Sequence, residues 1–149
     1  MTSKIFTTSL SLITLLFFIS SCIKGDIISE STDITGTWAV VGIRSDVSND
    51  WDGDGDYETD IYATYDYCQR DIILVFDDYG TGQGRQGCNS RWQNLNWQLT
   101  NANRTLRIDM SDDLIELNNL QVSHNTIRGE DNVYSNGRYY TIRYTLQRR

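Results

Sequence analysis

The sequence predicts an all-β protein, and specifically an antiparallel up-and-down barrel of about eight strands. From Arg70 to the end of the chain, apolar residues alternate with polar ones, which is the period of a half-buried strand. Turn-forming residues recur about every ten positions, a spacing typical of antiparallel sandwiches and barrels. No segment shows the periodicity of a long helix. Eight antiparallel strands joined by short turns can close into a barrel that is either filled or holds one small ligand.

The first strand is expected over residues 36–45, which overlaps the β-rich segment 34–43. Gly36 gives the backbone freedom where this strand begins. Trp38 is a large apolar side chain placed where the floor of a barrel needs closing. The rest of the predicted barrel therefore builds on this segment.

Four strands are expected in the middle of the chain. The first carries Ile72, Leu74 and Phe76 on one face and ends in a turn at residues 77–80. A glycine-rich strand over residues 82–88 can tolerate a bend or a close contact. The next two strands flank a turn at residues 101–103, and their apolar faces comprise Leu95, Trp97 and Leu99, then Leu106, Ile108 and Met110.

Three strands complete the barrel. Residues 114–122 and 126–134 flank a turn at His124 and Asn125. Asn136-Gly137 is a strong hairpin signal, because both residues accept positive φ. The last strand is the most regular, and one of its faces carries Tyr140, Ile142, Tyr144 and Leu146.

Residues 1–21 have the features of a secretion signal. Lys4 precedes an apolar run over residues 10–19 that is too short for a comfortable membrane span. The run ends in Ile19-Ser20-Ser21-Cys22, which resembles the lipobox of bacterial lipoproteins. The resemblance implies that Cys22 is acylated, for example with palmitate, and becomes the mature N-terminus. The alternative is an ordinary secreted protein that has a cysteine here by chance.

As a lipoprotein, the chain divides into the signal (1–21), the acylated cysteine with a polar tether (22–32) and a barrel domain (33–149). Each buried methylene contributes about 0.8 kcal/mol, so two or more acyl chains anchor stably. Ile23, rather than Asp, follows the cysteine, and in such lipoproteins this implies the outer membrane. We expect the protein to reach the membrane through the lipid on Cys22, and to be a monomer.

The charge balance argues against nucleic acid as a partner. The chain has 13 Lys and Arg against 20 Asp and Glu, and a formal net charge of -7. A phosphate-binding surface needs clustered basic residues, and here they are scattered along the sequence.

Once Cys22 carries lipid, Cys68 and Cys88 remain. Two remaining cysteines in an oxidising envelope usually pair, and the bridge would stabilise by roughly 3 kcal/mol. A reactive thiol or a metal pair is the rival interpretation. It is disfavoured because there is no C-x-x-C motif and no histidine nearby. We therefore predict a Cys68–Cys88 disulfide.

The ordered set of features is similar to the lipocalin-like lipoproteins of Bacteroidetes. It comprises the lipobox and tether, Gly36-Thr37-Trp38, Cys68, the strand 72–76 with Asp77-Asp78-Tyr79-Gly80, Cys88, Leu106-Arg107-Ile108 and a Tyr-rich last strand. Gly-x-Trp is also the entry-strand signature of true lipocalins. The resemblance covers nearly the whole mature chain and implies a small calyx-like barrel on an envelope lipoprotein. The long insertion between Asp46 and Tyr67 departs from it.

The insertion contains alternating carboxylates from Asp50 to Asp60. Asp52, Asp54, Asp56 and Asp60, with the carbonyl of Glu58, match the ligand spacing of a D-x-D-x-D calcium loop. Tyr57 stands where that loop needs glycine, and Ala63 where it needs a bidentate Glu, so a complete EF-hand is excluded. Two interpretations stay open, a partial calcium loop and a solvated acidic loop. No other cofactor is indicated.

From the sequence, we expect that the protein is not an enzyme. His124 is the one histidine and lies in a predicted turn, without the partners of a nucleophilic triad. Trp38, Trp97, Tyr140 and Tyr144 either line a cavity for a small, partly apolar ligand or fill the core. The leading hypothesis is therefore a lipid-anchored binding module. The alternative is a non-enzymatic envelope interaction or structural protein with a filled barrel and the acidic loop as its contact surface.

Overall fold

The computed structural model describes residues 33–149 except Asp112. The predicted signal peptide, Cys22 and the tether lie outside the described residues. In the described part of the chain, no helix has the length and apolar character needed to cross a membrane.

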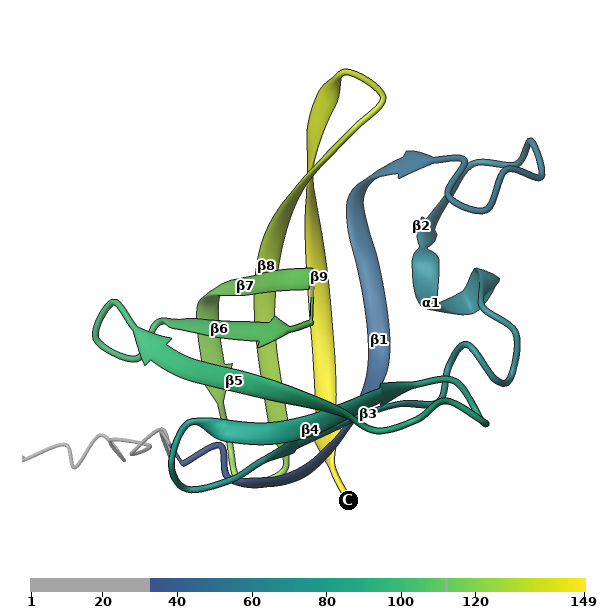
Figure 1. The fold of residues 1–149 in the computed structure, drawn as a ribbon. Helices are drawn as coiled ribbons and strands as arrows, with labels where there is room; N and C mark the ends of the chain where they lie inside the picture. Colours follow the sequence, from purple (N-terminus) through teal and green to yellow (C-terminus); the bar gives the residue numbers. More distant parts are fainter. Residues whose placement is uncertain (1–32, 112) are drawn as a thin grey trace, which may run out of the picture.

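The architecture is a closed antiparallel barrel of eight strands with one extra strand, as the sequence predicts (Figure 1). The sheet order is β2-β1-β3-β4-β5-β6-β7-β8-β9, and an additional pairing of β1 with β9 closes the barrel. This up-and-down topology is consistent with a lipocalin-like fold. The elements are β1 (Gly36–Asn49), β2 (Glu58–Asp60), α1 (Ile61–Thr64), β3 (Ile72–Phe76), β4 (Thr81–Gln86), β5 (Gln93–Thr100), β6 (Thr105–Met110), β7 (Asp113–Val122), β8 (Thr126–Ser135) and β9 (Arg138–Arg148).

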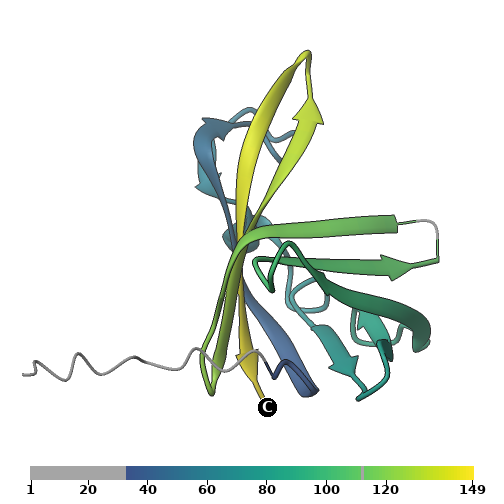
Figure 2. The same cartoon turned by 90° about the vertical axis from the view of Figure 1, so that its left-hand side faces the viewer.

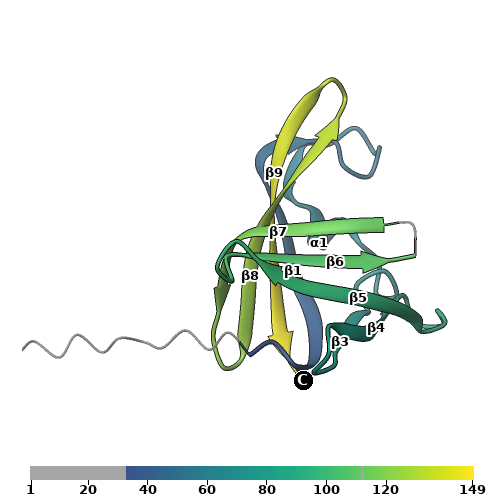
Figure 3. The same cartoon turned by 60° about the vertical axis from the view of Figure 1, so that its left-hand side comes forward.

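Two bulges bend the sheet. In β1, Val40 pairs with Leu146 and Gly42 with Thr145, so Val41 is an extra residue between them. In β7 the ladder to β8 shifts between Asn118 and Gln121. A bulge bends its strand and increases the local twist. Figure 2 shows β7 running across the barrel and then turning to align with β8, and Figure 3 shows β5 and β6 crossing β8 and β9 steeply.

The predicted turns are confirmed by the backbone. Asn136 and Gly137 have φ of 50° and 84°, as the hairpin between β8 and β9 requires. Asn101, Ala102 and Asn103 also adopt positive φ, between β5 and β6. The β8–β9 hairpin extends well beyond the neighbouring strands (Figure 1).

The first strand and the insertion differ in detail from the prediction. β1 continues to Asn49, four residues past the expected end at Ser45, because its second half pairs with both β9 and β2. The insertion itself adds β2 and the short helix α1, whose first turn Asp60 caps by accepting a hydrogen bond from the Ala63 amide. Neither element has a periodic apolar pattern that would predict it.

The core fills much of the barrel interior. β4 comes close to the facing side chains because it carries glycine on its inner face. A Cβ on Gly84 would lie 2.7 Å from Met110 Sδ and 3.1 Å from Leu74 Cδ2. The fully buried side chains are Ile34, Trp38, Phe76, Leu95, Leu106, Ile108, Leu117, Ile127 and Leu146.

Trp38 closes the floor of the barrel, the end at which β1 begins and β9 ends (Figure 1). Its side chain is fully buried, and its Nε1 donates a hydrogen bond to the Ile34 carbonyl at 2.8 Å. The Arg148 guanidinium lies 4.3 Å from the Trp38 ring centroid. Arg148 also donates to the Thr35 carbonyl at 2.7 Å and to the His124 carbonyl at 2.8 Å. One side chain of β9 therefore ties the entry of β1 to the β7–β8 turn.

Cys68 and Cys88 form the predicted disulfide, with their Cα atoms 4.8 Å apart. The bridge links the end of the insertion to the connection between β4 and β5. It therefore holds the insertion against the wall of the barrel.

Replacing Arg148 with Met should lower the free energy of unfolding by about 2 kcal/mol, because the cation–π contact and two charge-assisted hydrogen bonds are lost together. Urea denaturation measures the change. Arg149→Met is the matched control, since Arg149 is exposed and bonds to Thr37 through its main chain. Equal midpoints for the two variants would contradict the assigned role of Arg148.

Candidate functional site

A partly enclosed apolar cavity of about 200 Å³ lies in the barrel interior. Residues of the insertion, β1, β3, β4, β6, β7 and β9 surround it. They are Val40, Ile43, Tyr65, Ile72, Leu74, Arg85, Gln86, Ile108, Met110, Ile115, Leu117, Tyr144 and Leu146. Most of the lining is apolar, and its polar residues are Tyr65, Arg85, Gln86 and Tyr144.

Tyr144 is the polar residue most strongly affected by this environment. It pairs with Ile43 of β1 and Gly129 of β8, in the middle of the sheet. Burial raises the pKa of the Tyr144 phenol to about 12, and the charges of Asp131 and Tyr65 act in the same direction. The phenol therefore stays neutral and can both donate and accept a hydrogen bond.

Asp131 shares the inner face of β8, where it pairs with Ile142. Burial raises the pKa of the Asp131 carboxyl. The backbone hydrogen bond from Asn132 opposes this change, and the Glu116 carboxylate reinforces it. One acidic group thus lies on the inner side of the sheet near the Tyr144 phenol.

Of the four aromatic residues predicted to contact a ligand, Tyr144 lines the cavity. Trp38 forms the floor, beneath Arg148. Trp97 donates to the Asp77 and Thr81 carbonyls and packs edge-on against Phe76. Tyr140 is buried, donates to Asn49 Oδ1 at 3.2 Å and packs against the Trp51 ring. The structure does not bring these four side chains together at one site.

Several lining residues were not singled out from the sequence. The alternation of β6 predicts an apolar face for Met110 but gives it no role in a site. Tyr65 reaches the cavity because α1 precedes it in the insertion, and no sequence signal indicates this. Ile115 and Gln86 are recognisable only once the register of β7 and β4 is known.

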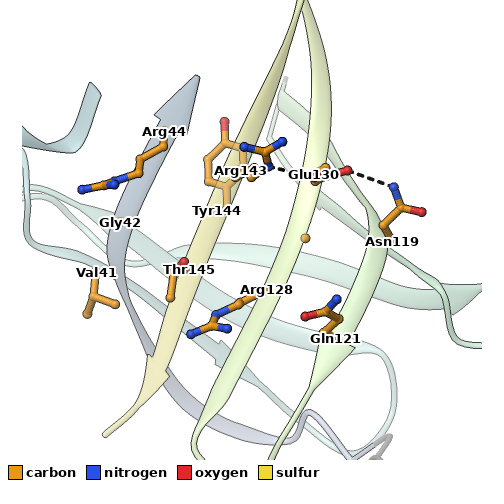
Figure 4. A pocket seen from close by; sticks show the side chains of 11 residues that line it. Val41, Gly42, Arg44, Asn119, Gln121, Arg128, Glu130, Arg143, Tyr144 and Thr145 are labelled. Carbon is orange, nitrogen blue, oxygen red and sulfur yellow. Dashed lines mark hydrogen bonds and ion pairs between the residues drawn. The ribbon is translucent and has the colours of Figure 1, made fainter. Parts of the chain in front are cut away.

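A second hollow, of about 550 Å³, lies on the outer face of the sheet formed by β1, β9, β8 and β7 (Figure 4). We call it the outer groove. It is lined by Val41, Gly42, Arg44, Asn119, Gln121, Arg128, Gly129, Glu130, Arg143, Tyr144 and Thr145. The side chains of Arg128, Arg143 and Thr145 alternate along their strands with core residues, so they point away from the interior.

Glu130 is the acidic residue of the outer groove. Its two carboxylate oxygens accept separate hydrogen bonds, from Asn119 Nδ2 and from Arg143 Nε, each at 2.9 Å (Figure 4). Both hydrogen bonds lower the pKa of the Glu130 carboxyl, and the bond from Asn119 has the larger effect. Asn119 reaches Glu130 from the β7 bulge, where its φ is 51°.

The acidic loop uses its carboxylates to cap its own backbone. Asp50 accepts hydrogen bonds from the Gly53 and Gly55 amides, and Asp52 and Asp54 each accept from the amide two residues on. Carboxylate oxygens of Asp50, Asp52 and Asp54 lie within 4.8 Å of one another.

The other predicted calcium ligands have different neighbours. Glu58 accepts a hydrogen bond from the Trp51 amide at 2.7 Å, and Asp60 forms an ion pair with Arg44 at 2.8 Å. The cluster thus has Asp52 and Asp54 from the predicted set, with Asp50 as the third member. Three carboxylates fall short of the six to eight oxygens that calcium takes, so carbonyls or water would have to supply the rest.

His124 lies in the turn between β7 and β8, and its carbonyl accepts the hydrogen bond from Arg148. A catalytic triad would need a carboxylate beside this imidazole. Among the described residues, no hydrogen bond or ion pair joins His124 to Asp131, the acidic residue near it in sequence.

The class that the fold defines is a closed eight-stranded antiparallel β-barrel with a small apolar interior cavity. Comparison of the chain with family models, with curated proteins and with solved structures gives no match.

Stability should fall as pH rises from about 10 to 12, because the unfolded chain releases the Tyr144 proton near 10.0 while the folded protein holds it to about 12. Below pH 10 both states keep the proton and this contribution is constant. The fall should amount to about 2 kcal/mol. Urea denaturation across this pH range measures it, and Tyr144→Phe should remove that part of the fall. An unchanged pH profile in the variant would contradict a buried phenol.

The two interpretations of the acidic loop differ in their response to chelation. A calcium loop predicts that EDTA lowers the Tm, that calcium restores it, and that Asp52→Asn abolishes the difference. Asp113→Asn, an exposed carboxylate outside the loop, is the matched control. A solvated loop predicts the same Tm with EDTA and with calcium, since its carboxylates already cap backbone amides.

Proposed function

We propose that this protein is an outer-membrane lipoprotein of lipocalin-like type that binds a small, partly apolar ligand inside its barrel. The observation that carries the proposal is the interior cavity of about 200 Å³ with an apolar lining. A barrel interior that served only as a hydrophobic core would be packed to high density, with few voids larger than a water molecule.

The size of the cavity bounds the ligand. Drug-sized ligands occupy pockets of about 300–1,000 Å³, and an apolar cavity of about 150 Å³ holds benzene. A single aromatic ring or a short acyl chain therefore matches the space better than a multi-ring compound. Tyr144, Tyr65 and Gln86 offer hydrogen bonds to one polar end of such a ligand.

Membrane anchoring rests on the lipobox-like Ile19-Ser20-Ser21-Cys22. The first described residues show where such a tether would join the domain. Ile34 and Thr35 lie at the floor of the barrel, where Trp38 and Arg148 hold them. A tether that enters here leaves the opposite end of the barrel free.

Titration with indole, p-cresol and hexanoate should give saturable binding for at least one compound, with amide NMR shifts at Ile72, Ile115 and Tyr144. Ile115→Phe should abolish binding, because the half-buried Ile115 lines the cavity and a larger side chain fills it. Leu114→Phe is the matched control, since Leu114 is 50% exposed and its side chain points away from the interior.

Absence of saturable binding by every compound would sink the ligand hypothesis. Binding that survives Ile115→Phe unchanged would show that the site lies elsewhere.

Cys22→Ser should release the protein from the membrane fraction and abolish incorporation of labelled palmitate, because the acceptor thiol is gone. The double variant Cys68→Ala with Cys88→Ala is the control, and it should stay membrane-bound and labelled. Fractionation and labelling of cells that express each variant measure both effects. A Cys22→Ser protein that still sediments with membranes would refute the anchor.

A second candidate is the envelope interaction protein, and the exposed aromatics of the insertion favour it. Tyr57 and Tyr67 are 73% and 86% exposed. Exposed tyrosines are enriched at protein interfaces because a large apolar ring carries a polar end. The cavity titration separates the two candidates, since only the binding module requires a ligand inside the barrel.

A further inference from the structure

The outer groove lies between two bulged strands, β1 on one side and β7 on the other, with β9 and β8 between them. Val41 is the extra residue of β1, and Asn119 lies in the bulged segment of β7. Between them Gly42 contributes no side chain to the outer face. The resulting space of about 550 Å³ falls in the size range of ligand pockets and exceeds the interior cavity.

The groove is basic in a chain whose formal net charge is -7. It contains three guanidinium groups, those of Arg44, Arg128 and Arg143, and one carboxylate, that of Glu130. Arg44 pairs with Asp60, and Arg143 pairs with Glu130 through Nε. Within the part of the chain that the structure describes, no carboxylate lies within ion-pair distance of Arg128. Because that guanidinium has no anionic partner, the groove has an uncompensated positive charge.

Hydrogen bonds hold three polar side chains of the groove in place, those of Asn119, Glu130 and Arg143. Because Arg143 donates to Glu130 through Nε, its terminal amino groups keep their donors for another partner. Arg128 lies in the middle of the groove, between Thr145 on β9 and Gln121 on β7 (Figure 4). Gln121 offers an amide and Thr145 a hydroxyl, and both groups can donate and accept.

We propose that the outer groove binds a sugar acid, a small polyhydroxylated molecule that carries a carboxylate. The planar guanidinium of Arg128 matches a carboxylate in a bidentate geometry. Gln121, Thr145 and the terminal amino groups of Arg143 then meet the hydroxyl groups of the same molecule. A neutral sugar lacks the partner for Arg128, and inorganic phosphate leaves the amide and the hydroxyl unused.

The test is a titration of the full chain with digalacturonate, followed by amide NMR and calorimetry. Lactose and inorganic phosphate are the comparison probes. Digalacturonate should shift the amides of Gly42, Arg128 and Thr145 in a saturable way, and should bind at least about tenfold more tightly than either comparison probe. Arg128→Gln should weaken binding about tenfold or more, the effect of losing one charge-assisted contact. Gln121→Ala should weaken it by a smaller factor.

Arg91→Gln is the matched control, because Arg91 is exposed and lies outside the groove, and the same charge is removed. Its affinity should equal that of the unaltered protein. Phosphate that binds as tightly as digalacturonate would overturn the proposal in favour of a simple anion site. So would equal affinities for Arg128→Gln and Arg91→Gln, or shifts confined to Ile72, Ile115 and the other cavity residues.

Discussion

The structure depends on the ladder between β1 and β9, which joins the first and last strands of the domain. Without it, the sheet would be open, with unpaired amides and carbonyls along the edges of β1 and β9. The ladder runs from Trp38 opposite Arg148 to Ser45 opposite Ile142. Its lower end is fixed by the Arg148 side chain, which covers the Trp38 ring and binds two carbonyls from other segments. Trp38 and Arg148 therefore serve two purposes: their backbones pair where β1 meets β9, and their side chains cover the core at the floor of the barrel.

Closure also relates the interior cavity to the outer groove, two hollows of opposite character. A sheet of eight strands must bend to meet itself, and here the bulges in β1 and β7 concentrate the bending. On the inner face, neighbouring side chains pack closely against Gly84 of β4, and a small apolar cavity remains beside the end of the same strand, at Gln86. On the outer face, the same bends leave a groove whose side chains are polar and basic.

The strands could be predicted from the sequence because period-two alternation and positive-φ turn residues are local signals. Asn136-Gly137 and the Ile72–Phe76 strand are examples in which pattern and structure agree. The disulfide was predictable for a different reason, since two cysteines remained to be paired. These signals determine which face of a strand points inward.

They do not determine where along the barrel an inward side chain lies. Trp38, Tyr140 and Tyr144 all point inward, yet they occupy the floor, a packed contact with Trp51 and the cavity wall, respectively. Those positions depend on strand register and on the bulges, which involve pairings between residues far apart in the sequence. The outer groove was missed for the same reason, because Arg44, Arg128 and Arg143 are scattered in the sequence and meet only across three strands.

The two ends of the barrel differ, and this asymmetry bears on how the domain would stand on a bilayer. The chain enters the fold at Asp33, beside the floor, while the acidic loop between β1 and β2 lies at the far end (Figure 1). If the tether attaches at the floor, the carboxylates at the tip come near a negatively charged lipid surface only when the domain tilts, and their repulsion then opposes the tilt. Repulsion and tether together would hold the long axis upright, with the insertion directed away from the lipid.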